Sequence, residues 1–89
     1  MYNLEIRESV DAIFRKLSKK DRPLYEQAMK KISEIISTAD VEHYKNLRYS
    51  MKELKRVHVG HFVLVFEYAK PEDKIVFVDF DHHDGIYGR

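Results

Sequence analysis

The 89-residue sequence contains no cysteine and no tryptophan, and it has three glycines and two prolines. Without cysteine, neither a disulfide framework nor a zinc site made of thiolates can form. The longest apolar run, Phe62 to Phe66, is far too short to cross a bilayer. The first residues alternate polar and apolar side chains, which is unlike a signal peptide. We therefore expect a cytoplasmic protein that does not enter a membrane.

The length predicts one domain that spans residues 1–89. A chain this short buries only about 60% of the surface of its unfolded form, so its core is modest. Apolar residues make up 44% of the sequence, which is enough to fold. A partner that binds the folded state would add directly to its stability.

Charge is distributed unevenly along the chain, although the net charge is only +1. Residues 45–58 carry five basic side chains against one acid, Glu53. Such a basic block indicates a surface that meets an anion. The same block is also typical of a solvated loop and an edge strand, where lysine discourages aggregation. Both interpretations remain open at this point.

Hydrophobic periodicity predicts a strand and two helices in the first 40 residues. Residues 2–7 alternate, with apolar side chains on one face of a half-buried strand: Tyr2, Leu4 and Ile6. Helical spacing follows from Val10 to Leu17, with Ser9 as the expected N-cap. Asp21 can cap a second helix that tolerates Pro23 in its first turn.

The second half of the sequence predicts three strands. Residues 40–53 show no clear period and are expected to form a loop, after which residues 54–59 alternate. Gly60 and His61 fit a two-residue type II′ hairpin turn. The nearly all-apolar run that follows predicts a central strand. A turn around Pro71 then leads to a final strand that becomes polar at its end.

The predicted order of elements is β-α-α-β-β-β. This order favours a two-layer α+β domain, in which an antiparallel meander carries a helical hairpin packed on one face. The first strand joins the same sheet. The opposite face of the meander is then free for a polar ligand, and Arg56 and His58 point to one side of their strand.

Two segments carry a resemblance to a known family. The hairpin reads L-x-R-V-x-V-G-x-F-x-L-V-F from Leu54 to Phe66, and the chain ends H-H-D-G-I-Y from His82 to Tyr87. Together with the element order and the length, they resemble the RelE/ParE superfamily of toxins, many of which end H-R-x-x-I-Y. The resemblance extends over nearly the whole chain.

The resemblance implies two different activities. RelE-like members cut mRNA on the ribosome without a metal or another cofactor, and a ribose 2′-OH attacks the adjacent phosphate. ParE-like members poison DNA gyrase and are not nucleases. Members of both kinds are held inactive by a cognate antitoxin in a toxin–antitoxin hetero-oligomer. The resemblance therefore implies antitoxin, mRNA and ribosome as partners, with a gyrase-directed or catalytically weak toxin as the alternative.

The sequence departs from the family pattern at two arginines. The arginine that usually stands three residues after the hairpin glycine is Val63 here, and the arginine of the tail is His83. The tyrosine of the tail is kept as Tyr87. Two guanidinium groups that would bind phosphate are therefore absent, which leaves the imidazoles as candidate replacements.

Cleavage of RNA needs a base, an acid and a cation near the phosphate. Histidine suits the first two roles because its ordinary pKa of about 6.5 lies near working pH. Arginine suits the third because its planar fork matches phosphate oxygens. The candidate catalytic residues are Arg56 for the phosphate, His58 and His83 for proton transfer, and Tyr87 for stacking or orientation. The candidate RNA-binding residues are Lys52, Lys55 and His82.

Other roles for these residues remain open. His58 and Arg56 can be exposed strand residues, Tyr87 can simply pack on the sheet edge, and His82 continues the alternation of the last strand as a half-buried structural residue. The run D-H-H-D offers ligand types that suit zinc or manganese. However, neighbours on a strand point to opposite faces, so His82 and His83 would not chelate one ion unless the strand had ended.

Overall fold

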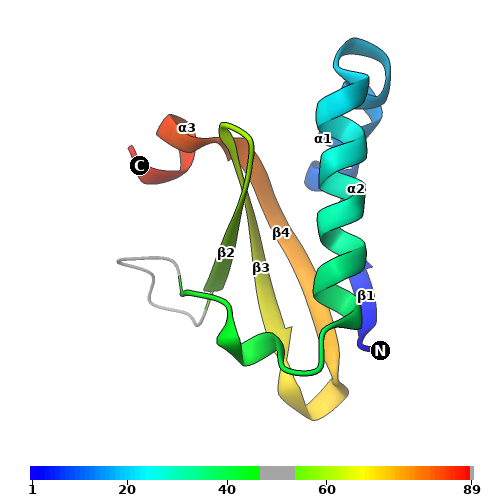
Figure 1. Ribbon diagram of the computed structural model, residues 1–89, viewed down its shortest axis with the longest axis vertical. Coiled ribbons are helices and arrows are strands. Elements are labelled where there is room, and N and C mark those ends of the chain that lie inside the picture. Colours follow the sequence, from blue (N-terminus) through cyan, green and yellow to red (C-terminus); the bar gives the residue numbers. More distant parts are fainter. Residues whose placement is uncertain (47–53, 89) are drawn as a thin grey trace.

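The computed structural model describes residues 1–46 and 54–88. Its elements follow the chain from blue to red in Figure 1. They are β1 (Asn3–Ile6), α1 (Glu8–Lys20), α2 (Arg22–Ser37), η1 (Val41–His43), β2 (Leu54–Val59), β3 (Phe62–Ala69), η2 (Lys70–Glu72), β4 (Lys74–His82) and α3 (His83–Tyr87). The predicted β-α-α-β-β-β order and α+β class are confirmed. The structure adds a short helix, α3, which the sequence did not predict.

The four strands form one sheet in the order β1-β4-β3-β2. Strands β2, β3 and β4 form the predicted antiparallel meander, and β1 joins it parallel to β4. Strand β3, which lies between two neighbours, is the apolar run Phe62–Ala69. None of the helices in the described part of the chain is long and apolar enough to span a membrane.

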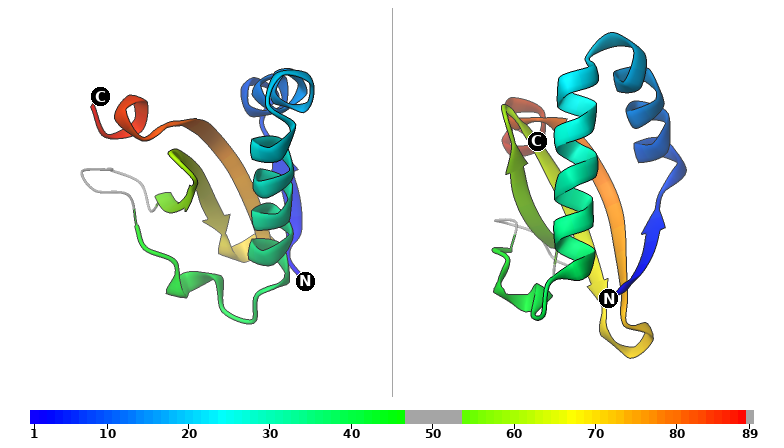
Figure 2. Two further views of the ribbon diagram at one scale, coloured as in Figure 1. Left: turned by 45° about the horizontal axis from the view of Figure 1, so that its top comes forward. Right: turned by 45° about the vertical axis from the view of Figure 1, so that its right-hand side comes forward.

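The two long helices lie on one face of the sheet. Helix α3 lies away from them, at the end of the sheet where β2 turns into β3, which we call the hairpin end (Figure 2). The main core fills the space between the long helices and the sheet and includes the fully buried Phe66, Phe77 and Ile35. A second, smaller cluster consists of Val63, Val65 and Ile86. Because Ile86 belongs to α3, this cluster joins the short helix to the sheet.

The starts of the two long helices differ in how they are capped. Asp21 caps α2 as predicted, since its Oδ1 accepts a hydrogen bond from the backbone N–H of Leu24 at 3.3 Å. The prediction for α1 was wrong, because Arg7 occupies the N-cap position without a side-chain hydrogen bond. Ser9 therefore lies inside the first turn. The backbone carbonyl of Arg7 accepts from Val10 and Asp11, which is enough to start the helix.

Strand β1 is less buried than its alternating pattern predicted. Tyr2 and Ile6 pack against the main core, but Leu4 is 45% exposed. The physical reason is the position of β1 at the edge of the sheet, where β4 is its only strand neighbour. A side chain on an edge strand is covered from one side only, so alternation alone does not ensure burial.

The turns of the meander have two different geometries. Gly60 has a φ of 61°, while His61 is not among the residues with positive φ, as the predicted type II′ turn requires. The segment around Pro71 forms the 3-10 turn η2, which ends at Asp73 with a φ of 49°. Aspartate is among the few residues that tolerate this left-handed conformation.

A β-bulge lies in the β3–β4 pair. Val65 pairs with Asp79 and Phe66 pairs with Phe77, so Val78 is the extra residue on β4. Val78 packs against the small cluster of α3 rather than against the main core. Because the bulge shifts the alternation by one residue, His82 does not share a face with Val78 as the sequence indicated.

Two side-chain contacts at the end of the sheet remote from the β2–β3 turn affect stability at alkaline pH. The hydrogen bond from Lys74 to Glu5, at 3.1 Å, raises the pKa of the Lys74 ammonium above its usual value. Desolvation, together with a hydrogen bond to Asp73, raises the pKa of the Tyr68 phenol. In each case the folded state holds the proton more tightly than the unfolded chain does.

The contribution of both groups to stability is therefore complete below their ordinary pKa values and is lost as the pH rises through the raised ones. We expect a variant carrying Glu5→Gln and Tyr68→Phe to lose thermal stability less steeply than the parent between about pH 9 and about pH 11. Circular dichroism melting curves at each pH measure this. Parallel pH dependences of the two proteins would contradict the assignment.

Candidate active site

Four residues from two distant parts of the sequence lie together on the sheet face opposite the long helices. The rings of His58 and His83 are stacked, with centroids 5.6 Å apart and planes inclined by 21°. The Tyr87 ring centroid lies 4.6 Å from that of His83 and 6.4 Å from that of His58. The guanidinium carbon of Arg56 lies 5.8 Å from the centre of the Tyr87 ring. We call these four residues the His–Tyr–Arg cluster.

Strand β2 delivers Arg56 and His58 by simple alternation. Val57 and Val59 point to the opposite face, where they pack against the main core. Arg56 and His58 therefore share the other face. The two-residue turn at Gly60 and His61 keeps β2 in register with β3, pairing His58 with Val63 and Arg56 with Val65.

Helix α3 delivers His83 and Tyr87. The two residues are four apart on a helix, so they lie on the same side of it. The backbone N–H of His83 donates to the carbonyl of His61 in the hairpin turn at 2.8 Å. Ile86, which is only 7% exposed, packs on Val63 and Val65 of β3. The turn and this apolar contact therefore hold α3 beside β2.

The cluster is open on its outer side. His58 is exposed, the side chain of His83 is 49% exposed, and Tyr87 is 37% exposed. Arg56 is partly buried, and its Nε is a buried donor without a hydrogen-bond partner among residues 1–46 and 54–88. An unpaired buried donor costs about 1–3 kcal/mol, and such groups are rare enough to need an explanation. The site thus combines one partly buried guanidinium with two accessible imidazoles.

Strand β4 adds two carboxylates to the same face. The register aligns Arg56, Val65 and Asp79 in one row across the sheet. In the next row, Val63 separates His58 from Asp81. The basic side chains of β2 and the acids of β4 therefore flank the valines on which Ile86 sits.

His82 lies outside the cluster. It pairs with Phe62 across the sheet, and their rings meet edge to face at 5.7 Å. Its Nδ1 accepts a hydrogen bond from the backbone N–H of Asp84 at 3.3 Å, which caps α3. His82 therefore starts the helix, whereas the next residue, His83, faces the cluster. The contact of His82 with RNA stays a prediction. Its role as the cap of α3 does not depend on RNA.

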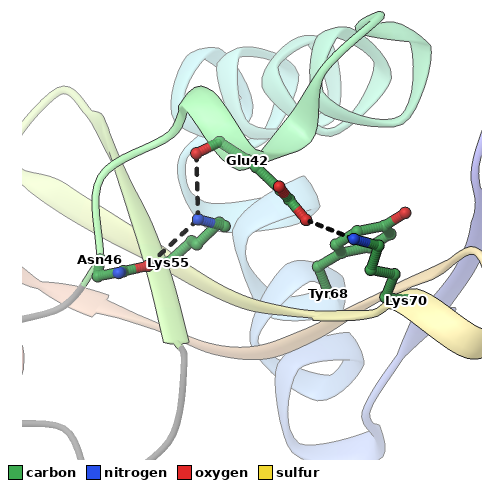
Figure 3. Close-up of a pocket in the computed structure, with 5 residues that line it drawn as sticks. All are labelled: Glu42, Asn46, Lys55, Tyr68 and Lys70. Carbon is green, nitrogen blue, oxygen red and sulfur yellow. Dashed lines mark hydrogen bonds and ion pairs between the residues drawn. The ribbon is translucent and has the colours of Figure 1, made fainter.

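Lys55 has a structural role in place of the expected exposed position. It is only 8% exposed, and its ammonium donates to the carbonyl of Tyr44 at 3.1 Å. It also donates to the carbonyl of Glu42 at 3.4 Å and to Oδ1 of Asn46 at 3.2 Å (Figure 3). Three acceptors satisfy the three protons of an ammonium. The ammonium is therefore occupied within the protein. The other predicted RNA-binding lysine, Lys52, lies outside the described residues.

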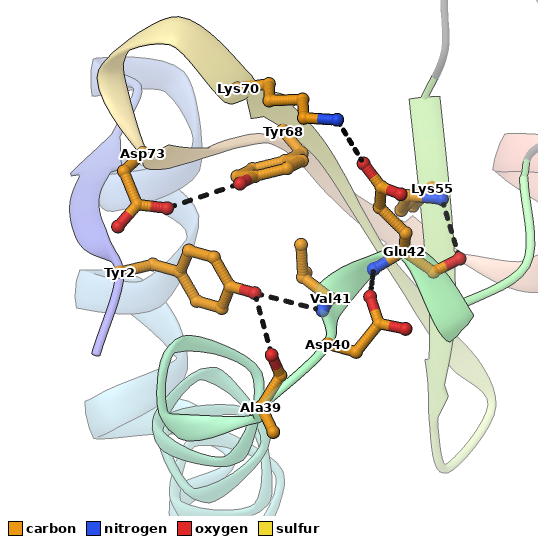
Figure 4. A network of polar contacts seen from close by, with 9 residues as sticks. All are labelled: Tyr2, Ala39, Asp40, Val41, Glu42, Lys55, Tyr68, Lys70 and Asp73. Atoms are coloured by element: carbon orange, nitrogen blue, oxygen red, sulfur yellow. Dashed lines mark hydrogen bonds and ion pairs between the residues drawn. The ribbon is translucent and has the colours of Figure 1, made fainter.

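Lys55 belongs to a polar region at the end of the sheet remote from the hairpin turn. A pocket of about 330 Å³ lies there, and Glu42, Lys55, Tyr68 and Lys70 are among its lining residues (Figure 3). Beside it, the Tyr2 hydroxyl donates to the carbonyl of Ala39 and accepts from the backbone N–H of Val41 (Figure 4). These contacts hold the segment after α2 against the sheet.

Val63 stands where the family usually has the arginine three residues after the hairpin glycine. Val63 is fully buried beneath Ile86, in the small cluster that seats α3. An imidazole does not take over this place, because the nearest histidine, His58, stands on the neighbouring strand. His83, at the other departure, does lie in the cluster.

The metal interpretation of D-H-H-D receives no geometric support. Strand β4 does end at His82, and Nδ1 of His82 and Nδ1 of His83 lie 3.8 Å and 3.6 Å from the Asp84 carboxylate. The rings otherwise part, because His82 contacts Phe62 while His83 contacts His58 and Tyr87. Within residues 1–46 and 54–88, no group of three or more histidine and acidic side chains is arranged to hold a metal ion.

Solved structures with the same fold define the class of domain. The chain matches the RelBE toxin–antitoxin complex of E. coli with a TM-score of 0.73 and 21% identity, covering 92% of this chain and 96% of that one. A metal-bound toxin from Helicobacter pylori matches with a TM-score of 0.78 and 20% identity, over 97% and 99% of the two chains. At these identities the likeness establishes the fold alone, which is that of the RelE toxins.

Sequence comparison establishes the family. The family model for the ParE toxin of the type II toxin–antitoxin system, parDE, matches residues 2–87. A protein of Methanocaldococcus jannaschii named "Putative toxin RelE4" is 48% identical over 88 residues, covering 98% of this chain and 92% of that protein. An uncharacterized Methanosarcina mazei protein is 43% identical, over 98% and 100%. The chain belongs to the ParE toxin family, within the RelE/ParE superfamily of toxin–antitoxin systems.

Three residues near the cluster were not predicted from sequence. Asp79 and Asp81 face it only because the bulge sets the register of β4. Gly85 is important because it approaches Asp81 closely. In the sequence, Asp79 and Asp81 form the polar end of an apolar strand. However, they alternate with phenylalanine as the polar residues of any half-exposed strand do, so the pattern did not indicate a site.

The role of Lys55 can be measured directly. We expect Lys55→Met to lower the free energy of unfolding by about 1–3 kcal/mol, because its polar acceptors lose their donor. Lys70→Met is a matched control: its side chain is 77% exposed and makes only a 3.8 Å ion pair with Glu42. Urea unfolding measures both changes. Equal, small effects of the two substitutions would show that the Lys55 contacts contribute little.

Proposed function

We propose that this toxin is a metal-independent endoribonuclease that cleaves mRNA on the ribosome by attack of a ribose 2′-OH on the adjacent phosphate. The observation that carries the proposal is the convergence of Arg56, His58, His83 and Tyr87 on one open sheet face. Residues separated by more than 20 positions in the sequence meet there with the chemical groups that this reaction needs.

The reaction assigns one proton transfer to each histidine. One imidazole, in its neutral form, removes the proton of the 2′-OH while the 2′-oxygen bonds to phosphorus. The other, in its protonated form, donates its proton to the 5′-oxygen as the P–O bond to it breaks. The products are a 2′,3′-cyclic phosphate and a free 5′-OH. Rings with centroids 5.6 Å apart can serve the attacking and leaving oxygens of one phosphodiester.

Arg56 and Tyr87 complete the site. The Arg56 guanidinium can stabilise the negative charge that builds up on the phosphate oxygens. Its buried Nε lacks a partner within the part of the chain that the structure describes, which favours a role for this side chain in binding an anion. Tyr87 exposes part of its ring beside His83 and can stack on an unpaired base. Either histidine can act as the base, and the other then acts as the acid.

A cognate antitoxin is the expected partner in a hetero-oligomer. The family is that of a type II toxin–antitoxin system, and the same fold has been solved in the RelBE toxin–antitoxin complex. We propose that the antitoxin lays a helix or a strand over apolar surface of the toxin and covers the His–Tyr–Arg cluster. This binding would also stabilise a domain whose own core is small.

The second candidate is a ParE-like toxin, directed at gyrase or otherwise acting by binding a protein. The match to the ParE family model and the two missing arginines favour it. Such a toxin needs no proton donors. The two candidates therefore differ in how they respond to loss of the imidazoles.

Loss of the cluster side chains tests the nuclease proposal in cells. We expect His83→Ala and Arg56→Ala each to abolish growth arrest when the toxin is expressed alone, because each removes a group that acts on the phosphodiester. Each loss of proton transfer is worth roughly 10²- to 10⁴-fold in rate. His61→Ala is the matched control, since His61 lies outside the cluster, and it should arrest growth like the parent. Full arrest by both cluster variants would favour the protein-binding toxin.

The cleavage itself can be mapped on transcripts. We expect primer extension to reveal new mRNA ends that appear with the parent, persist in EDTA and disappear with His83→Ala. The 2′,3′-cyclic phosphate at the upstream end is a further signature of 2′-OH attack. Transcripts that stay intact while cells stop growing would overturn the nuclease proposal.

A further inference from the structure

The inner side of α3 approaches β4 so closely at Gly85 that a side chain there would have to displace the carboxylate of Asp81. A β-carbon added to Gly85 would stand 2.7 Å from Cγ of Asp81 and 3.1 Å from its Oδ1, and closer still to its Oδ2. Real β-carbons do not approach other atoms within 3.0 Å. The Asp81 carboxylate thus occupies the volume that any other residue at position 85 would need.

We propose that Asp81 and Gly85 are a positioning pair that sets how deeply α3 sits on the sheet, and hence where His83 and Tyr87 stand relative to β2. The inference rests on the proposed nuclease function for its consequence in activity. Its structural content, the placement of α3, stands apart from that function and can be measured without RNA.

A hydrogen bond to the neighbouring backbone opposes displacement of the Asp81 carboxylate. Its Oδ1 accepts a hydrogen bond from the backbone N–H of His82 at 2.7 Å, just before α3 begins. To make room for a larger residue 85, the carboxylate would have to give up this bond, or α3 would have to rise. The hydrogen bond from the His83 N–H to the His61 carbonyl limits movement at the start of the helix. We infer that the far end, which carries Tyr87, moves most.

The contacts that α3 makes with the sheet have different effects on its position. Ile86 attaches the helix to Val63 and Val65, and that apolar contact alone would allow the helix to rock. Gly85 against Asp81 fixes its height on the β4 side, while Tyr87 and His83 meet Arg56 and His58 on the β2 side. A change in height at Gly85 is therefore passed to the stacked rings across a single helical turn.

The stop has a catalytic consequence because the two imidazoles must reach one phosphodiester. A displacement of about 1 Å at a reacting group can cost roughly 10²-fold in rate. Glycine is a poorer helix former than alanine, so its presence in the middle of α3 is unfavourable for the isolated helix. The close approach to Asp81 explains why that unfavourable residue stands there.

The test uses four variants that separate volume from charge. Gly85→Ala should reduce transcript cleavage by about 10²-fold, because α3 is displaced. Asp81→Ala combined with Gly85→Ala restores the space and should recover most of the lost rate. Asp81→Asn combined with Gly85→Ala removes the charge but keeps the volume, so it should stay as poor as Gly85→Ala alone. Asp81→Ala alone removes the stop, so it should lose activity as well, since the Ile86 contact alone lets α3 rock.

Nuclear magnetic resonance measures the placement itself on histidine-labelled protein without RNA. We expect nuclear Overhauser contacts between the rings of His58 and His83 in the parent and in the Asp81→Ala, Gly85→Ala protein. These contacts should be lost in Gly85→Ala and in Asp81→Asn, Gly85→Ala. Thermal unfolding by circular dichroism shows which variants remain folded, and if Gly85→Ala does not fold, the two double variants carry the comparison.

Unchanged ring contacts in a folded Gly85→Ala protein would overturn the positioning role, since Asp81 would then have turned aside without moving α3. Equal behaviour of the two double variants would overturn it as well, because volume would not matter. Should the parent fail to cleave RNA while the ring contacts follow the predicted order, the proposed nuclease function falls and the positioning pair stands.

Discussion

The packing of Ile86 on Val63 and Val65 joins two parts of the chain that carry the candidate site. One face of the sheet is covered by two long helices, but the other face is covered at its hairpin end by a helix of five residues. A helix this short has no stability of its own in water, so its position depends on what it packs against. Without this apolar contact, His83 and Tyr87 would belong to a loose chain end rather than to a site.

The same region shows why the family departures have different consequences. Val63, at the place of one missing arginine, is fully buried in the apolar cluster that seats α3. His83, at the place of the other, remains in the cluster beside His58 and Tyr87. The site therefore differs from an arginine-rich one in its chemical groups: it has one partly buried guanidinium and two accessible imidazoles.

At the end of the sheet remote from the β2–β3 turn, the surroundings of a charged residue differ from those its sequence context indicates. Lys55 belongs to a basic block, and a basic block indicates a surface for anions. In the structure its ammonium instead ties β2 to the segment after α2 through the carbonyl of Tyr44 and, as Figure 3 shows, through the carbonyl of Glu42 and the side chain of Asn46. A buried ammonium is tolerated only where acceptors surround it, and those acceptors come from backbone atoms that a sequence pattern does not reveal.

The sequence by itself determined the element order, the two-layer class, the cap at Asp21, the hairpin turn at Gly60 and the facing of Arg56 and His58, because each depends on local period or on one residue's backbone preference. Only the tertiary structure decided that the tail forms α3, that His82 and His83 part to different surroundings, and that Asp81 meets Gly85. These features depend on a bulge in β4 and on contacts between strands and a short helix. Such contacts join residues whose spacing along the chain carries no period, so they exist only once the sheet has formed.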